Sequence, residues 1–154
     1  MISLFRIDDR LVHGQIMAVW ARVLNINHII VTDDGTASDA FSMQLLKLAM
    51  PPSIQLTVTG ITDAVQLLQN AASDKSHTLV LMKSVESAFR LHTLFPLNHL
   101  NVGGIGMAPG RQLMWRSIAA TEAEVSLLRS MARGGVNVYL QLIPSEEKRV
   151  LSDG

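Results

Sequence analysis

Residues 78–83 have the sequence TLVLMK, and residues 28–32 have the sequence HIIVT. Both segments are short and rich in aliphatic side chains, and their apolar residues are consecutive instead of alternating with polar ones. Strands that are apolar on both sides are typical of a parallel sheet that helices cover on both faces. These segments therefore predict an α/β chain with three α/β/α layers around a central, mainly parallel sheet.

Short strand-like segments alternate with longer segments of helical period along the rest of the chain, which is typical of a layered α/β domain. The expected strands are residues 2–7, 28–32, 54–59, 78–83, 100–103 and 136–143, with a less regular one at 114–119. The expected helices are residues 14–24, 36–50, 62–72, 85–94 and 122–133. The pattern predicts a sheet of six or seven strands.

Two local features refine this expectation. Thr121 and Glu124 have the spacing of a capping box, and Gly134 and Gly135 follow the same helix, where a left-handed C-cap is common. Only about ten residues separate the strands near Val102 and Ser117, whereas a parallel crossover normally needs a dozen or more. Chain length alone therefore predicts that this pair of strands is antiparallel.

The composition limits the function. The 154 residues, 48% of them hydrophobic, suit a single domain spanning 1–154, with the polar residues 145–154 as a short tail or helix. Thirteen basic residues balance thirteen acidic ones, and the chain has no cysteine, so we expect no nucleic-acid partner, disulfide or thiolate site. Charges interrupt the first twelve residues, and no apolar run reaches the roughly 18 residues of a membrane span. We expect a cytoplasmic protein without direct membrane insertion.

The strand-to-helix connection RIDDRLVHGQ, residues 6–15, is the richest in chemically reactive groups. Ligands of open α/β sheets bind beyond the carboxyl ends of the strands, where this connection is expected to lie. His13 directly precedes Gly14 at the expected start of a helix, where free N–H groups favour an anion and glycine leaves the backbone open. The connection is therefore the candidate site.

The residue types in this connection suit phosphoryl transfer. A neutral imidazole is a nucleophile near pH 7, so His13 is the candidate nucleophile and Asp8 the candidate group that orients it. Arg10 offers a fork of donors that fits phosphate oxygens. The structural alternative is that Asp8, Asp9 and Arg10 form surface ion pairs while His13 caps the helix. On the residues alone the two interpretations are about equally supported.

Two other functions stay open at this point. A metal-dependent phosphatase or hydrolase would use Asp8, Asp9 and Asp33 as metal ligands. A non-catalytic sensor would bind an anion reversibly at the start of the first helix. Asp33 is more simply explained by a turn or helix cap. The other histidines, which show no metal-ligand spacing, are His28, His77, His92 and His99.

RIDDRLVHGQ closely resembles the active-site motif of the enzyme IIB subunits of the mannose/fructose/sorbose family of the bacterial sugar phosphotransferase system. Similar segments are IIVTDD, KLAMPP, LNVGGIG and TEAEVSLLRSMARGGVNVYLQLIP, so the resemblance covers residues 1–145. One departure is Gly104, where many members of the family have asparagine. The resemblance implies a wholly parallel sheet with the first strand inside it, contrary to the antiparallel pair expected from length.

The resemblance also implies a function. His13 would accept a phosphoryl group from a IIA subunit and pass it to a sugar during uptake through the membrane subunits IIC and IID, with Asp8 and Arg10 in support. The enzyme would be a protein-Nπ-phosphohistidine–sugar phosphotransferase, recruited to the inner face of the cell membrane, with no cofactor or metal. Further phosphate- or substrate-binding residues are expected at Gly14, Gln15, Lys83 and Ser84. The sugar itself is not implied.

Overall fold

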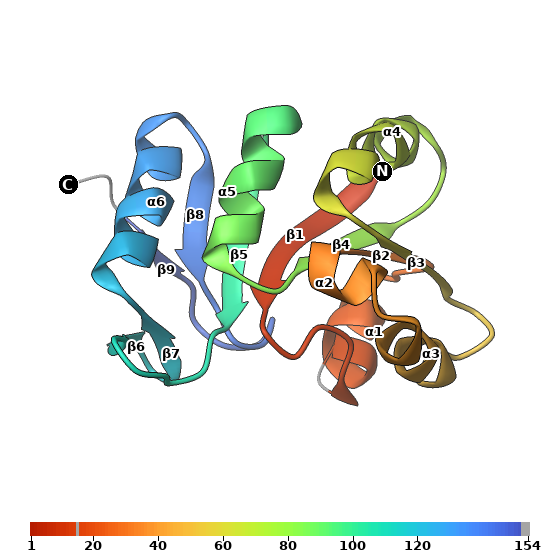
Figure 1. The fold of residues 1–154 in the computed structure, drawn as a ribbon, viewed down its shortest axis with the longest axis horizontal. Coiled ribbons are helices and arrows are strands. Elements are labelled where there is room, and N and C mark those ends of the chain that lie inside the picture. The colour runs from red at the N-terminus through yellow and green to blue at the C-terminus, as the bar shows by residue number, and fades with distance from the viewer. Residues whose placement is uncertain (15, 152–154) are drawn as a thin grey trace.

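The central sheet has the predicted mainly parallel character. The structure is a computed structural model that describes residues 1–14 and 16–151. Within these residues a seven-stranded sheet has the order β3-β2-β4-β1-β5-β8-β9, and every pairing in it is parallel except that between β8 and β9 (Figure 1). Its strands are β1 (Ile2–Asp8), β2 (His28–Thr32), β3 (Gln55–Thr59), β4 (Thr78–Met82), β5 (His99–Gly104), β8 (Asn137–Leu140) and β9 (Arg149–Val150).

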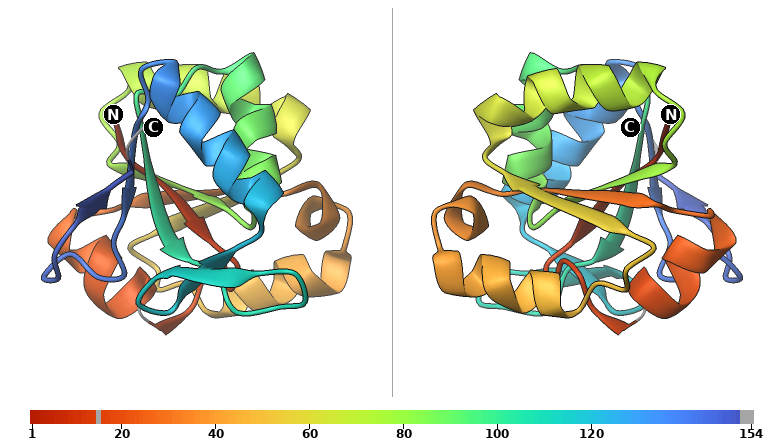
Figure 2. Two further views of the ribbon diagram at one scale, coloured as in Figure 1. Left: turned by 90° about the vertical axis from the view of Figure 1, so that its left-hand side faces the viewer. Right: turned by 90° about the vertical axis from the view of Figure 1, so that its right-hand side faces the viewer.

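Helices cover both faces of the sheet and so confirm the three layers (Figure 2). One face packs against α4 (Ile61–Ser73), α5 (Val85–Leu94) and α6 (Glu122–Arg133). The other face packs against the π-helical segment η1 (Ile16–Trp20) with α1 (Ala21–Val23), and against α3 (Ala40–Leu48). A short helix, α2 (Asp34–Ala37), follows β2.

Strand β1 lies inside the sheet, as the resemblance implied, and its side chains alternate between the two layers. Phe5 and Ile7 join the core beneath α4, α5 and α6, whereas Leu4 joins the core beneath η1 and α1. Arg6 and Asp8 follow Leu4 at intervals of two residues, so their side chains leave the same face of β1 as that of Leu4. Two charged side chains are therefore directed into the layer that contains η1.

The expected strand at 114–119 is wrong in detail. These residues belong to an antiparallel hairpin of β6 (Gln112–Trp115) and β7 (Ile118–Ala120), which is separate from the main sheet. The antiparallel pairing exists, but within the hairpin and not between the strands near Val102 and Ser117. The wholly parallel sheet is also a wrong expectation, because β9 pairs antiparallel with β8.

Two expected helices differ from those in the structure. The segment 36–50 contains α2 and α3, because the Asp39 carboxylate accepts hydrogen bonds from Phe41 N and Ser42 N and so starts a new helix. The segment 14–24 contains the π-helical η1 before α1. In contrast, α6 has the expected bounds and the capping box of Thr121 with Glu124.

The end of the chain and its apolar segments complete the fold. Within residues 145–151 the secondary structure is the strand β9 and not a helix; residues 152–154 of the expected tail lie outside the described part. No helix in residues 1–14 or 16–151 is both long and apolar enough to cross a membrane.

Candidate active site

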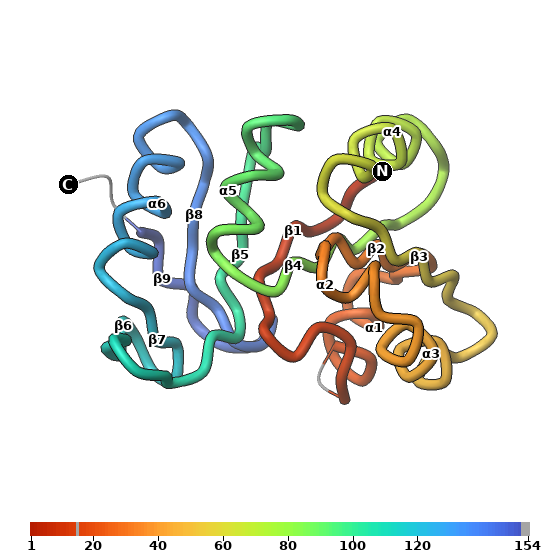
Figure 3. Tube along the Cα trace, in the orientation of Figure 1, coloured from red at the N-terminus to blue at the C-terminus, as the bar shows by residue number. Residues whose placement is uncertain are grey.

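The connection after β1 is a tight loop at the edge of the sheet where β5 also ends (Figure 3). Asp9 N donates to Gly104 O at 2.7 Å, and Leu11 N donates to Asp8 O at 2.9 Å. Leu11 has a φ of 55°, a left-handed conformation that is costly for a leucine. Its side chain is buried in the core beneath η1. Burial of Leu11 thus contributes to the loop conformation that places His13.

His13 and Asp8 are joined by a short hydrogen bond, as the sequence predicted. His13 Nε2 lies 2.8 Å from Asp8 Oδ2, with 15% of the histidine side chain and none of the aspartate side chain exposed. A carboxylate only accepts hydrogen bonds, so Nε2 carries the proton in this contact. In the neutral imidazole the lone pair is then on Nδ1.

Asp8 is held by more than His13. Its Oδ1 accepts a hydrogen bond from Arg10 N at 3.1 Å and lies 3.5 Å from Arg10 Nε, while Arg6 Nη2 donates to Oδ2 at 3.3 Å. The Arg10 side chain is 56% exposed, whereas Arg6 is 1% exposed. Desolvation lowers the pKa of Arg6, and the charge and hydrogen bond of Asp8 act in the opposite direction. Asp8 therefore connects a buried cation with an accessible one.

An open pocket of about 540 Å³ adjoins this network. Its lining residues come from loops that follow β1, β2, β4 and β5, and they are Asp9, Arg10, Asp33, Lys83, Ser84 and Arg111. Three predicted residues are thus brought together, namely Arg10, Lys83 and Ser84. His13 is outside this lining, but it shares Asp8 with Arg10, so the imidazole and the pocket are neighbours.

The predicted binding residues have different surroundings. Lys83 is exposed, and within residues 1–14 and 16–151 its ammonium group has no ion-pair partner. Ser84 caps α5 by accepting a hydrogen bond from Ser87 N at 3.1 Å. Apart from its two chain neighbours, a β-carbon at Gly14 would meet no atom of the described residues within 4 Å. Gln15 lies outside the described residues.

The sequence did not single out Arg111 or Arg6. Arg111 Nε and Nη2 donate to the Glu124 carboxylate at 3.1 and 3.4 Å, and its Nη1 donates to Gly106 O at 2.9 Å. These bonds hold the Arg111 guanidinium at the wall of the pocket that Arg10 and Lys83 also line. Arg6 is part of the motif, but three of its four hydrogen bonds go to residues far away along the chain, namely Asn101, Gln141 and Leu142.

The acidic residues are occupied by structural contacts. Asp9 Oδ2 accepts from Gly106 N at 2.8 Å, and Asp33 Oδ2 accepts from Thr36 N and Thr36 Oγ1 at 2.9 and 2.7 Å. Asp33 is therefore the helix cap that the sequence favoured. Within the described residues no three acidic or histidine side chains are grouped to hold a metal ion. This arrangement gives no support to Asp8, Asp9 and Asp33 as a ligand set.

Two of the other histidines have structural partners. His99 Nε2 accepts a hydrogen bond from Phe5 N at 3.1 Å, and burial followed by the charge of Lys148 lowers the pKa of His99. His28 Nε2 lies 2.8 Å from Thr57 Oγ1, and burial lowers the pKa of His28. These rings stay neutral more readily than free histidine, and they serve as hydrogen-bond partners within the fold.

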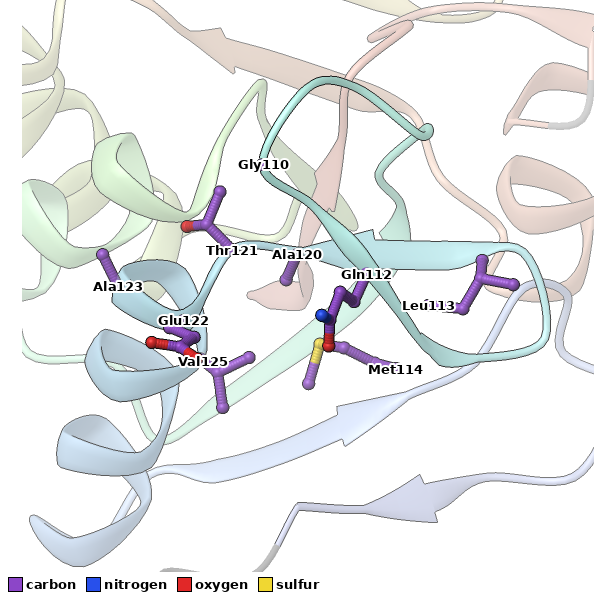
Figure 4. Close-up of a pocket in the computed structure, with 9 residues that line it drawn as sticks. All are labelled: Gly110, Gln112, Leu113, Met114, Ala120, Thr121, Glu122, Ala123 and Val125. Carbon is purple, nitrogen blue, oxygen red and sulfur yellow. The ribbon is translucent and has the colours of Figure 1, made fainter.

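A second pocket, of about 530 Å³, lies between the β6–β7 hairpin and the start of α6 (Figure 4). It contains Gln112, Met114 and Thr121, and none of the predicted site residues. Thr121 is already engaged in the capping box. The chemistry is therefore concentrated in the loops around His13 and not in this pocket.

Comparisons with known proteins agree with this geometry. Residues 2–153 match the family described as the PTS system sorbose subfamily IIB component. The chain is 27% identical to the sorbose-specific EIIB component of Klebsiella pneumoniae over 94% of this chain and 89% of that protein. The crystal structure of manxB from Thermoanaerobacter tengcongensis superposes with a TM-score of 0.88 at 32% identity, covering 99% of this chain and 93% of that one.

A longer relative is the mannose-specific EIIAB component of Escherichia coli, which is 24% identical over 99% of this chain and 48% of its own length. The family match spans nearly the whole described chain and includes the loop that carries His13. The chain thus belongs to the mannose/fructose/sorbose family of enzyme IIB components, the phosphotransferases that act in sugar uptake.

Proposed function

We propose that His13 is the phosphoryl carrier of this enzyme, and that the group is attached to Nδ1. The observation that carries this proposal is the 2.8 Å contact between His13 Nε2 and the buried Asp8 carboxylate. It occupies one ring nitrogen and leaves the other as the nucleophile.

The transfer step follows from this arrangement. The Nδ1 lone pair attacks the phosphorus of the donor, the bond between phosphorus and the donor atom breaks, and its electron pair leaves with the donor. The ring, which still bears the Nε2 proton, becomes positively charged. The Asp8 carboxylate lies against that proton and stabilises the charge, as expected for an orienting carboxylate.

The phosphoryl oxygens need positive charge and donors. Arg10 is the candidate for this role, because its guanidinium is exposed and is anchored to Asp8 only through Nε. Lys83 and Ser84 line the same pocket, and Lys83 provides a cation without an ion-pair partner in the described residues. Gly14 adds no side chain next to His13, which suits the approach of an incoming group. Positioning and charge of this kind are what phosphoryl transfer requires.

The partners of the reaction follow from the family. The donor is a IIA subunit, which the EIIAB name of the mannose-specific relative supports, and the acceptor is a sugar handled by membrane subunits IIC and IID. The protein would act on the cytoplasmic side and be recruited to the membrane by those subunits. An open, polar site suits successive short encounters with a donor and an acceptor.

Intact-mass measurement tests the role of His13. After incubation with phosphorylated IIA, the wild-type protein should gain one phosphoryl group, and His13→Ala should gain none. The label should be labile in acid and stable in alkali, as expected for a phosphorus–nitrogen bond. His77→Ala is the matched control, because His77 precedes β4 at the opposite end of the sheet from His13. Labelling of His13→Ala, or loss of labelling in His77→Ala, would contradict the proposal.

A further inference from the structure

Arg6 occupies an unusual position for a charged side chain. It lies on β1, in the middle of the sheet, with 1% of its side chain exposed. Arginine is almost never buried to this extent unless it is paired. Arg6 and Asp8 are two residues apart on one strand, so their side chains leave the same face of the sheet.

Four hydrogen bonds fix the Arg6 guanidinium. Nη1 donates to Asn101 Oδ1 at 2.6 Å and to Gln141 O at 3.0 Å. Nη2 donates to Leu142 O at 3.0 Å and to Asp8 Oδ2 at 3.3 Å. Three of these acceptors lie on β5 or directly after β8, so the guanidinium cannot move unless those segments move too.

Trp20 and two glycines enclose the same group. The Arg6 Cζ atom lies 4.8 Å from the centre of the Trp20 ring, and Trp20 Nε1 donates to Leu142 O at 3.1 Å. A β-carbon at Gly103 would lie 1.9 Å from Arg6 Cζ, and one at Gly104 would lie 2.8 Å from Asp8 Oδ1. The end of β5 therefore has room for the guanidinium and the carboxylate only because these two residues have no side chain.

Such a pair is a costly way to build a core. Removing two charges from water is expensive, and apolar side chains of similar volume are often as stabilising or more so. What the buried pair provides here is a fixed direction for Asp8. With Oδ2 shared between Arg6 and His13, the carboxylate cannot rotate without breaking both contacts.

We propose that Arg6 is a positioning residue for phosphoryl transfer, acting through Asp8 on His13. This proposal rests on the proposed role of His13. Arg6 fixes the Asp8 carboxylate, Asp8 fixes the Nε2 proton, and Nδ1 is thereby the single ring nitrogen presented to the donor. The segment that follows β8 belongs to the active site through its two carbonyl groups, although it lies more than a hundred residues from His13 in the sequence.

The test uses a small phosphoryl donor, so that binding of a partner protein does not enter. Phosphoramidate phosphorylates imidazole: its phosphorus–nitrogen bond breaks, ammonia leaves with the electron pair, and a new bond forms to the ring nitrogen. The variants are Arg6→Lys, which removes the fork, and Gly103→Ala, which keeps the arginine but displaces it. Gly134→Ala adds the same methyl group at the end of α6, where the nearest atoms are 3.5 Å away, and is the control.

The decisive measurement is the phosphohistidine isomer, determined by NMR of the labelled ring. Wild type and Gly134→Ala should carry the group on Nδ1 alone. Arg6→Lys and Gly103→Ala should label up to about 100-fold more slowly, because a misplacement of about 1 Å can cost about 10²-fold in rate, and they should give a share of the Nε2 isomer. A general loss of stability does not change which nitrogen reacts, so the isomer distinguishes positioning from a structural role.

A measurement on the wild-type protein covers the case in which both variants fail to fold. The guanidinium ¹⁵N signals of Arg6 should shift when His13 becomes phosphorylated, because the Asp8 carboxylate joins the two groups. Folded variants with wild-type rates and the Nδ1 isomer alone, or Arg6 signals that do not move, would overturn the proposal for Arg6. Absence of any label on wild-type His13 would instead overturn the proposed function.

Discussion

The ion pairs Arg6–Asp8 and Arg90–Asp34 join the same two residue types in different surroundings. Their nearest nitrogen and oxygen atoms are 3.3 and 3.0 Å apart, but the side chains are 1% and 0% exposed in the first pair and 49% and 54% exposed in the second. Water screens an exposed pair, which typically contributes about 0–1 kcal/mol. A buried pair adds little to the stability of a protein, but removing one partner lowers that stability strongly because the other charge is left buried without a partner. An arginine–aspartate pair can therefore orient a catalytic group when it is buried, as proposed for Arg6–Asp8, but contributes little to stability when it is exposed, as in Arg90–Asp34.

Replacing Asp8 by asparagine should have the largest effect. Asp8→Asn removes the negative charge that stabilises the phosphorylated imidazolium and leaves a single oxygen. If that oxygen stays with Arg10 N, the amide nitrogen takes the Oδ2 position, which faces both Arg6 and His13. That nitrogen donates, which favours a lone pair on Nε2 and a proton on Nδ1, the wrong tautomer for attack. We expect phosphoryl transfer to slow by at least about 10²-fold, in line with the losses seen when an orienting carboxylate is amidated.

Single-turnover labelling with phosphorylated IIA measures this rate, and ¹⁵N NMR of the imidazole identifies the tautomer. Asp74→Asn is the control, because Asp74 precedes β4 at the opposite end of the sheet and its Oδ1 accepts from Ser76 N at 2.9 Å, a bond that an amide oxygen can also accept. Equal rates for Asp8→Asn and wild type would mean that the buried carboxylate has no orienting role.

The capping box of α6 should show an intermediate effect, and on stability only. Thr121 Oγ1 accepts from Glu124 N at 3.1 Å, and Glu124 Oε1 accepts from Thr121 N at 2.9 Å. Thr121→Ala should lower the free energy of unfolding by about 1 kcal/mol and leave transfer unchanged. Urea denaturation and a labelling assay on the same preparation check both parts. Thr121→Ser should keep the wild-type stability, and a transfer defect in either variant would show that the Thr121 cap affects the site through Glu124 and Arg111.

The sequence predicted what local chemistry determines. The bounds of α6 and the capping box were correct because Thr121 and Glu124 interact across three residues. The contact of Asp8 with His13 was likewise expected, because both lie in one short loop. The bonds from Arg6 to Gln141 O and Leu142 O could not be predicted. Every residue has a backbone carbonyl whatever its type, and these two lie far from Arg6 along the chain.

The wrong expectations have equally local causes. The β6–β7 hairpin turns at Arg116, which has a φ of 50° although such turns usually contain glycine or asparagine, so the sequence showed no turn. The break between α2 and α3 was marked by Asp39, a good N-cap, but the apolar period continued across it. The π-helical η1 has no sequence signal of comparable strength.

The smallest effect is expected for a substitution in the exposed pair Arg90–Asp34. Asp34 Oδ1 accepts from Ile61 N at 2.9 Å, and Arg90 Nη1 donates to Oδ2 at 3.0 Å. The backbone bond from Ile61 and then the bond from Arg90 lower the pKa of Asp34 from its ordinary value of 3.8. Asp34→Asn keeps an oxygen for Ile61 N but replaces Oδ2 by a nitrogen, so the charge and the bond from Arg90 are both lost.

The effect of Asp34→Asn should therefore be small and should depend on pH and salt. A carboxylate whose pKa is lowered by folding stabilises the protein above its unfolded pKa, and this contribution is lost as the pH falls through the folded pKa. We expect a loss below about 0.5 kcal/mol at pH 7, which shrinks in 1 M salt and disappears in acid below the folded pKa. Urea denaturation of both proteins at several pH values and two salt concentrations measures it. A loss above about 1 kcal/mol that is insensitive to salt would show that Arg90–Asp34 behaves like a buried pair, and burial would then not explain the difference from Arg6–Asp8.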